Sequence, residues 1–352
     1  MIFSNLKISD QVLKNRIFVS PMCQYSSDKF GSPSIWHYYH LSKLLMSNAG
    51  MLIIESTAVN PAGRITNKDL CLYTKKQRKG FTDLINFLKK FDKKIPICVQ
   101  LSHSGRKGSS NIPWIKTNSP LKKNSWKTFA PSSIKKDRFW PNPKELNNTE
   151  IKNIINDFES VIKFLKNSKI DGVEIHMAHG YLLHQFFSPL SNKRTDKYGV
   201  TLKNRSRFLL EIAKIVRKSW PSSKILGARI TGEDYSNKGI NLEDSIYLAK
   251  NLEKIGFDYI CVSSGGMDNI FKKNLKSYRV KLAQEIKKNV SIPVGTTGEL
   301  DNYKFLNNAL RKNKIDFAAI GKKFLKDSMW LIALAKKFKN MEMIPKQYLR
   351  AF

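Results

Sequence analysis

The sequence predicts an α/β protein folded as a closed (β/α)8 barrel, and three observations support the prediction. Short β-branched segments alternate along the chain with segments whose apolar residues recur at helical spacing. Eight such pairs occur, which favours a closed barrel over an open sheet. The predicted strands are almost continuously apolar, as expected of parallel strands covered on both faces. One barrel domain is therefore expected over residues 1–352.

The predicted strands and helices follow one another in regular order. The eight strands are expected at Ile17–Met22, Met51–Thr57, Ile97–Ser102, Gly172–Met177, Leu226–Thr231, Tyr259–Ser264, Ile292–Thr297 and Phe317–Gly321. The eight helices are expected at Trp36–Met46, Gln77–Phe91, Ile151–Lys166, Asn204–Lys218, Leu242–Ile255, Val280–Lys288, Asn302–Arg311 and Leu325–Phe338. Two residues are suited to capping a helix N-terminus, Thr149 before the third helix and Asn241 before the fifth.

The connection after the third strand, residues 103–148, breaks this alternation. It carries five prolines and three tryptophans and shows no helical period. A segment this long without regular structure is usually functional, and this one follows a strand on the catalytic side of a barrel. We expect a lid or a substrate-side excursion. The tryptophans fit either a small core of the excursion or contacts to a substrate.

Composition excludes several classes of protein. The chain is 41% hydrophobic and 26% charged, which is typical of a soluble globular protein. Its longest apolar runs fall far below the roughly 18 residues of a membrane span, and the N-terminus lacks the pattern of a signal peptide. The four cysteines are scattered without a CxxC pair, which disfavours a zinc or iron–sulfur site. We expect a cytoplasmic protein without a metal.

The formal charge of +34 raises the question of a nucleic-acid partner. The basic residues are spread over almost every segment, including the outer faces of the predicted helices, and form no single patch. This distribution is more typical of a lysine-rich proteome than of a binding surface. We expect weak, non-specific polyanion binding at low salt and neither a specific nucleic acid nor a membrane as partner.

Polar residues and glycines collect where the predicted strands end, which is where barrel enzymes place their chemistry. In chain order the residues at these ends are 20–25, 55–58, 100–107, His176 with His179, Arg229, 263–266, 295–298, and Gly321 with Lys322. The glycines after the seventh strand, with Gly321 and Lys322 after the eighth, predict a phosphate site, because backbone N–H groups can approach an anion closely there.

Six motifs carry a resemblance to a known family: SPMCQY, ESTAVNPAGR, VQLSHSGRK, DGVEIHMAHGYLLHQFFSPLSNKRTDKYG, NRSRFLLEI and IGKKFL. They resemble the old yellow enzymes, FMN-dependent ene-reductases with a TIM-barrel fold. Within that family they are similar to the thermophilic-like class, which has a cysteine after the first strand and an arginine near the C-terminus. The resemblance implies an NADPH dehydrogenase that reduces the C=C bond of α,β-unsaturated carbonyl compounds, with hydride transfer from flavin N5.

The resemblance also implies catalytic roles. His176 and His179 correspond to donors that hydrogen-bond the substrate carbonyl oxygen, where negative charge develops. Tyr181 corresponds to the proton donor to the α-carbon. Cys23 corresponds to a thiol that tunes the flavin, and Tyr25 to a contact with the substrate oxygen.

Further positions correspond to cofactor and subunit contacts. The residues implied to bind FMN are Ser20, Pro21, Cys23, Ala58, Gln100, His176, Arg229, Gly298, Gly321 and Lys322, with Lys107 near the same face. For Arg229, a buried ion pair with Glu174 or Glu233 is an alternative. Arg350 corresponds to a residue that enters the substrate site of a neighbouring subunit, within residues 341–352, which implies a homodimer or homotetramer.

Three positions depart from the family pattern. Val200 stands where a second glycine is usual, which is costly if the backbone needs a positive φ there. Lys322 stands in place of the usual phosphate-binding arginine, so it keeps the charge but loses the bidentate fork. Glu299 adds an anion beside the phosphate glycines, and both changes could weaken FMN binding.

Three other functions are alternatives for this sequence. A flavin enzyme similar to tRNA-dihydrouridine synthase would use an appended helical RNA-binding region, which this chain lacks. A 2,4-dienoyl-CoA reductase would add an iron–sulfur cluster and a second nucleotide domain, for which neither the cysteines nor the length suffice. A redox-inactive barrel remains the last alternative, although the catalytic set is intact.

Overall fold

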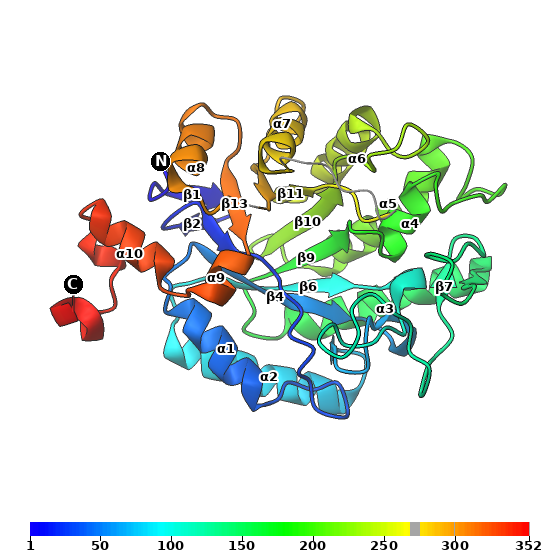
Figure 1. Cartoon of the computed structure of the whole chain (residues 1–352), viewed down its shortest axis with the longest axis horizontal. Coiled ribbons are helices and arrows are strands. Elements are labelled where there is room, and N and C mark those ends of the chain that lie inside the picture. The colour runs from blue at the N-terminus through cyan, green and yellow to red at the C-terminus, as the bar shows by residue number, and fades with distance from the viewer. Residues whose placement is uncertain (268–274, 299, 352) are drawn as a thin grey trace.

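A closed barrel of parallel strands forms the centre of the molecule (Figure 1). The computed structural model describes residues 1–267, 275–298 and 300–351. The barrel strands are β3 (Ile17–Val19), β4 (Met51–Ala58), β6 (Ile97–Ser102), β9 (Gly172–Met177), β10 (Ile225–Thr231), β11 (Tyr259–Ser263), β12 (Val294–Thr297) and β13 (Phe317–Ile320). Each pairs in parallel with the next, and pairing of β3 with both β13 and β4 closes the ring. The predicted (β/α)8 fold is confirmed.

Helices cover the outside of the barrel and present their apolar faces to it (Figure 1). Between the strands lie α1 (Ile35–Leu45), α2 (Lys75–Phe91), α3 (Asn148–Lys166), α5 (Leu202–Ser219), α6 (Leu242–Ile255), α7 (Leu275–Lys287) and α8 (Tyr303–Arg311). A short strand, β5 (Leu70–Cys71), pairs with β4 beside the ring. Asn241 caps α6 as predicted, since its side chain accepts a hydrogen bond from Asp244 N.

Three local predictions are wrong. The last predicted helix, Leu325–Phe338, is divided into α9 (Lys322–Lys326) and α10 (Trp330–Lys337), because Asp327 is extended and its carboxylate accepts a hydrogen bond from Met329 N. The cap of α3 is Asn147 rather than Thr149, with Glu150 completing a reciprocal capping pair. A further short helix, α4 (Leu182–Phe187), follows β9 where none was expected.

An N-terminal hairpin closes one end of the barrel. Its strands, β1 (Leu6–Ile8) and β2 (Gln11–Leu13), pair in antiparallel fashion. Leu6, Ile8 and Leu13 are buried in one apolar cluster with Tyr259 and Phe317, which begin β11 and β13. The hairpin therefore seals the N-terminal ends of the strands and leaves the C-terminal ends for the functional site.

The excursion after β6 has little regular structure, as predicted. It contains a turn of 3-10 helix at Gly105–Lys107 and two short paired strands, β7 (Phe129–Ala130) and β8 (Lys144–Glu145). Of its tryptophans, Trp140 is buried, whereas Trp114 is exposed and its ring lies 6.1 Å from that of Tyr25. One face of the excursion therefore lies over the first strand end.

None of the helices in the described residues is both long and apolar enough to cross a membrane.

Candidate active site

A histidine pair lies at the end of β9, where a left-handed turn brings the two rings together. His176 is the last residue but one of this fully buried strand, and His179 and Gly180 follow it with φ of 58° and 71°. The resulting turn places His179 Nδ1 3.2 Å from His176 Nε2. A Cβ at position 180 would overlap the carbonyl oxygen of Gly266, so glycine is required there.

Both imidazoles are neutral at pH 7. Burial, followed by the positive charges of Arg229 and Lys107, lowers the pKa of His176 well below its usual value. Burial, followed by His176 and Arg229, does the same to the pKa of His179. Neutral rings in a buried site can donate a hydrogen bond without carrying a charge.

The partners of the two rings define their tautomers. His176 Nδ1 accepts a hydrogen bond from Ala178 N at 3.1 Å, so the proton of the neutral ring is on Nε2 and points to His179. His179 Nε2 lies 2.7 Å from Ser263 Oγ, on β11. If His179 accepts at Nδ1 from His176, its own proton is on Nε2 and is donated to Ser263.

Tyr181 follows the histidines and lies against His176, with the ring centroids 5.0 Å apart and the planes at 88°. Burial raises the pKa of Tyr181 well above its usual value, and nearby Cys23 adds to the shift. Burial raises the pKa of Tyr25 in the same way, with contributions from Cys23 and Tyr181. Because these groups influence one another's pKa, the residues predicted after the first and fourth strands lie in one site. Both phenols keep their protons at neutral pH.

Cys23 lies on the segment after β3, which the buried side chain of Glu55 supports. Glu55 accepts a hydrogen bond from Gln24 N, and its other oxygen lies 3.0 Å from His37 Nε2. Burial, then the charges of Glu55 and Asp69, raises the pKa of the Cys23 thiol well above its usual value. Cys23 is therefore a neutral thiol.

Lys107 joins two of the loops at the barrel mouth. Its ammonium donates to the carbonyl oxygens of His179 at 2.7 Å and Gly266 at 3.3 Å. It also lies 5.2 Å from the centre of the Tyr181 ring. Burial, followed by nearby Lys136 and Arg106, lowers the pKa of Lys107 to about 7. The side chain predicted to lie near the flavin face thus supports the histidine turn.

A buried polar network lies beneath the histidines. Arg229 Nη2 donates to Ser20 Oγ at 3.0 Å, and Arg229 Nε lies 3.5 Å from Glu174 Oε1. Gln100 donates to the same Glu174 oxygen at 2.7 Å, and Tyr259 donates to the other. The alternative ion pair predicted for Arg229 is therefore present with Glu174. Arg229 Nε nevertheless makes no hydrogen bond to any described residue.

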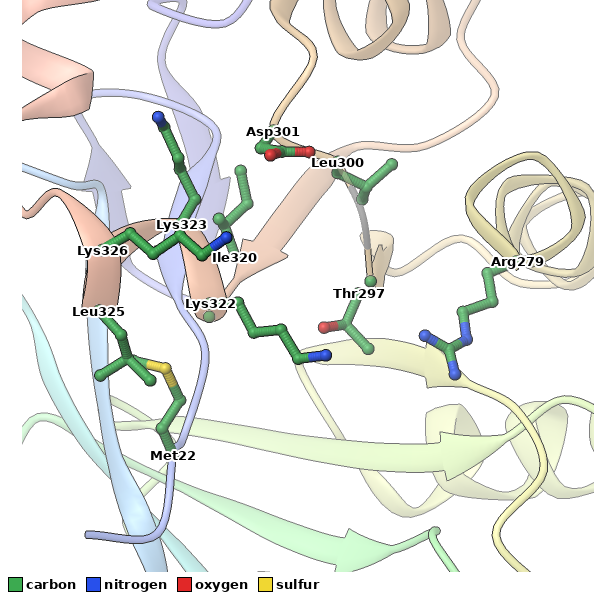
Figure 2. Close-up of a pocket in the computed structure, with 12 residues that line it drawn as sticks. Met22, Arg279, Thr297, Leu300, Asp301, Ile320, Lys322, Lys323, Leu325 and Lys326 are labelled. Carbon is green, nitrogen blue, oxygen red and sulfur yellow. The ribbon is translucent and has the colours of Figure 1, made fainter. Parts of the chain in front are cut away.

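A cationic cavity of about 450 Å³ opens at the ends of β12 and β13 (Figure 2). Its lining includes Gly298, Gly321 and Lys322, the three residues predicted to hold a phosphate, and Lys323 and Lys326 add further charge. Gly298 has φ of 95°, which only glycine adopts readily. Glu299 lies outside the described residues.

The remaining predicted residues lie at the edges of this arrangement. Ala58 is buried at the end of β4, and Pro21 is half-buried after β3. Arg350 is exposed in the terminal turn Lys346–Ala351, at the outer edge of the molecule (Figure 1). Val200 has φ of 66°, so the missing glycine is a real cost, because β-branched residues rarely adopt this conformation.

Sequence reasoning assigned no role to two side chains of the site, Ser263 and Arg279. Ser263 ends β11 inside the range that was expected to be strand, and nothing marked it as a partner of His179. Arg279 lines the cationic cavity, but the predicted helix began one residue later, at Val280. A search of every loop on the catalytic side for cations would have included it.

A family model and several curated proteins match this chain. The model of the NADH:flavin oxidoreductase / NADH oxidase family matches residues 1–340. The NADPH dehydrogenase of Clostridium acetobutylicum is 37% identical over 355 residues, covering 100% of this chain and 99% of that protein. The NADPH dehydrogenase of Bacillus subtilis is 34% identical over 352 residues, again covering 100% and 99%.

The chain belongs to the NADH:flavin oxidoreductase / NADH oxidase family. Solved structures share its fold. The old yellow enzyme homologue from Zymomonas mobilis has a TM-score of 0.80 at 21% identity and covers 96% of this chain and 92% of its own. Morphinone reductase in complex with tetrahydroNAD has a TM-score of 0.78, also at 21% identity, covering 96% and 91%. The predicted family is confirmed, and this flavin oxidoreductase is an enzyme that uses FMN and a nicotinamide reductant.

The residues of this flavin oxidoreductase fit FMN. Arg229 Nε is buried and makes no hydrogen bond within the described chain, although Glu174 Oε1 lies 3.5 Å away, so its N–H is available to an acceptor on a ligand. The cavity at β12 and β13 supplies the cations and the exposed glycine backbone that a phosphate needs.

Proposed function

We propose that the enzyme reduces the C=C bond of α,β-unsaturated carbonyl compounds such as enones, quinones and maleimides, with NADPH as the electron source. The observation that carries the proposal is the convergence of His176 Nε2 and His179 Nδ1, two neutral and buried ring nitrogens 3.2 Å apart. A carbonyl oxygen placed between them would gain negative charge as the double bond is reduced, and two fixed donors stabilise that charge.

For both rings to donate, His179 must carry its proton on Nδ1. His179 Nε2 then has a lone pair, and the hydroxyl of Ser263, 2.7 Å away, donates to it. A serine hydroxyl can reverse its role because it is both a donor and an acceptor. We therefore infer that Ser263 permits the tautomer of His179 that binds substrate.

Tyr181 is proposed as the proton donor to the α-carbon. Its raised pKa keeps the phenol protonated at neutral pH, and its contact with His176 places it beside the carbonyl site. A positioned acid contributes on the order of 10²–10⁴ in rate. Tyr25 and the neutral thiol of Cys23 are proposed to line the opposite side of the same space, with Tyr25 contacting the substrate oxygen.

When bound, FMN supplies the two-electron chemistry that couples oxidation of NADPH to reduction of the double bond. The residues proposed to hold the ring system are Ser20, Pro21, Cys23, Ala58, Gln100, His176 and Arg229, and those proposed to hold the phosphate are Gly298, Gly321 and Lys322. A fixed positive charge from Arg229 stabilises the anionic reduced state of a flavin. Glu174 offsets part of that charge, because it lies 3.5 Å from Arg229 Nε.

We also propose that the enzyme is a homodimer or homotetramer in which Arg350 enters a neighbouring substrate site. The support is its position: Arg350 is exposed on a terminal turn that extends from the outer edge of the subunit (Figure 1). Residues 103–148 are proposed as the substrate-side lid, since exposed Trp114 lies over Tyr25. Four free cysteines favour a cytoplasmic location.

The test is an absorbance spectrum of the purified protein, followed by anaerobic titration with NADPH and then cyclohexenone. A flavin band near roughly 450 nm should bleach with NADPH and return with the enone. A band that bleaches but returns only with oxygen would contradict ene reduction while leaving the flavin oxidoreductase intact. A His179→Ala variant serves as the control, because it should still bleach with NADPH but respond weakly to cyclohexenone.

A further inference from the structure

We propose that Arg279, on α7, binds the phosphate of FMN and supplies the guanidinium that position 322 lacks. The proposal concerns cofactor binding and depends on FMN being the cofactor, not on the identity of the alkene. It starts from the cationic cavity at the ends of β12 and β13, where Arg279 is one of the lining residues (Figure 2).

The first argument is the direction of the side chain. Figure 2 shows Lys322 and Arg279 extending into the cavity from opposite sides, with Thr297 between them. A Cβ added to Gly298 would overlap Arg279 Nη1, so the guanidinium lies directly across this glycine. An anion bound to the backbone at Gly298 would therefore lie beside Nη1.

The second argument is how the guanidinium is held. Arg279 Nε donates to Ser264 Oγ at 2.8 Å, and Nη2 lies 3.5 Å from the carbonyl oxygen of Ser264. Both contacts are to the end of β11, on one side of the guanidinium. Nη1 makes no hydrogen bond to any described residue, and no carboxylate in the described chain pairs with Arg279. The donors of Nη1 are thus fixed in place and available to a ligand.

The third argument is charge. Lys322, Lys323 and Lys326 line the cavity with Arg279, and among the described residues of the lining Asp301 is the single acidic one. A lysine is a point charge, whereas arginine presents a planar fork that matches a phosphate in bidentate fashion. The family pattern has an arginine at position 322, which supplies both the charge and the bidentate fork for the phosphate. Here the ammonium of Lys322 would supply the charge and the guanidinium of Arg279 the fork. This arrangement also explains how the enzyme tolerates lysine at position 322.

A purely structural role for Arg279 makes a different prediction. If Arg279 only anchors the end of β11 through Ser264, its loss should disturb the neighbouring His179 and Ser263 and weaken every flavin equally. If it binds phosphate, its loss should weaken FMN and spare riboflavin, which has the same ring system and no phosphate.

The experiment compares these two ligands. Flavin-stripped, full-length wild type, Arg279→Gln and Arg279→Lys are titrated with FMN and with riboflavin, and binding is followed by quenching of flavin fluorescence. Lys281→Gln is the matched control, because it removes one positive charge from an exposed position on the same helix. Ultrafiltration of each purified holoenzyme gives an independent measure of FMN release.

Arg279→Gln should raise the Kd for FMN roughly 10- to 100-fold, as expected for loss of charge-assisted hydrogen bonds, and leave the Kd for riboflavin within about two-fold. Arg279→Lys should lie between wild type and Arg279→Gln, and Lys281→Gln should match wild type. An unchanged Kd for FMN, or equal loss of both ligands, would overturn the proposal. Neither result depends on cyclohexenone reduction, so failure of the ene-reductase proposal would be seen separately.

Discussion

Replacing Ser263 by alanine tests the central feature of the proposed site. The hydroxyl of Ser263 is fully buried and lies 2.7 Å from His179 Nε2. Alanine keeps the backbone of β11 and removes only this partner. Ser263 would not touch the substrate itself, so any effect on the alkene step must pass through His179.

The size of the effect follows from the burial of the pair. In the substrate complex, Ser263→Ala leaves the lone pair of His179 Nε2 without its donor, at a position where the Ser263 side chain is fully buried. An unpaired buried polar group costs about 1–3 kcal/mol. Since about 1.4 kcal/mol is a factor of ten, the affinity for cyclohexenone should fall roughly 5- to 150-fold.

Two measurements check this reasoning. Anaerobic stopped-flow mixing of reduced enzyme with cyclohexenone gives the Kd and the rate of the alkene step. Nitrogen-15 NMR of labelled histidine reports the tautomer, and His179 should change from Nε2–H to Nδ1–H when a carbonyl ligand binds to wild type. Ser263→Cys, which retains a weak donor, should recover part of the affinity. An unchanged Kd in Ser263→Ala, or a liganded wild type that keeps Nε2–H, would refute the reasoning.

Three further changes have defined outcomes. Tyr181→Phe should slow the alkene step by about 10²–10⁴-fold, and the rate of flavin reduction by NADPH should stay within a few-fold of wild type. Separate anaerobic half-reactions measure the two rates, and equal slowing of both would argue against Tyr181 as the proton donor. Val200→Gly should stabilise the protein by about 1 kcal/mol, or raise Tm by roughly 1–2 °C, because it removes the strain of a β-branched residue in the left-handed backbone conformation. Val12→Gly is the control: Val12 is 62% exposed and Val200 65%, but Val12 lies on a strand, so its replacement by glycine should lower the stability of the protein. The folded pKa of Lys107, about 7, is lower than the usual 10.5, so the unfolded chain binds more protons between these values. The free energy of unfolding of wild type should therefore rise relative to that of Lys107→Met as pH rises from 7 to about 10. Chemical unfolding at each pH measures it, and a constant difference between the two proteins would show that Lys107 does not titrate in this range.

The barrel and most of the site could be predicted because both depend on local patterns. A buried parallel strand is apolar along its whole length, and the first polar residue or glycine after it marks the catalytic end. His176, Arg229 and Lys322 were found in this way, and the structure places each of them at such an end. The positive φ at Val200 was also anticipated, because the usual glycine indicated what the backbone requires.

What could not be predicted depends on contacts between distant segments. Ser263 matters because it meets a histidine 84 residues earlier in the chain, and nothing in its own neighbourhood indicates this. The break between α9 and α10 comes from one carboxylate, that of Asp327, which turns back to a backbone N–H within a segment of helical periodicity. The sequence suggests Glu174 as a partner for Arg229, but it does not indicate that Glu174 also accepts hydrogen bonds from Gln100 and Tyr259.

The hairpin at the N-terminus constrains the order in which a newly made chain can acquire its structure. Its Leu6 and Ile8 are synthesised long before Tyr259 and Phe317, with which they share one buried apolar cluster. During most of synthesis these apolar side chains have no complete surface to cover them, and exposed apolar segments of unfinished chains promote aggregation. A chain that stops before β13 would therefore lack Phe317 and leave the apolar side chains of the hairpin partly exposed.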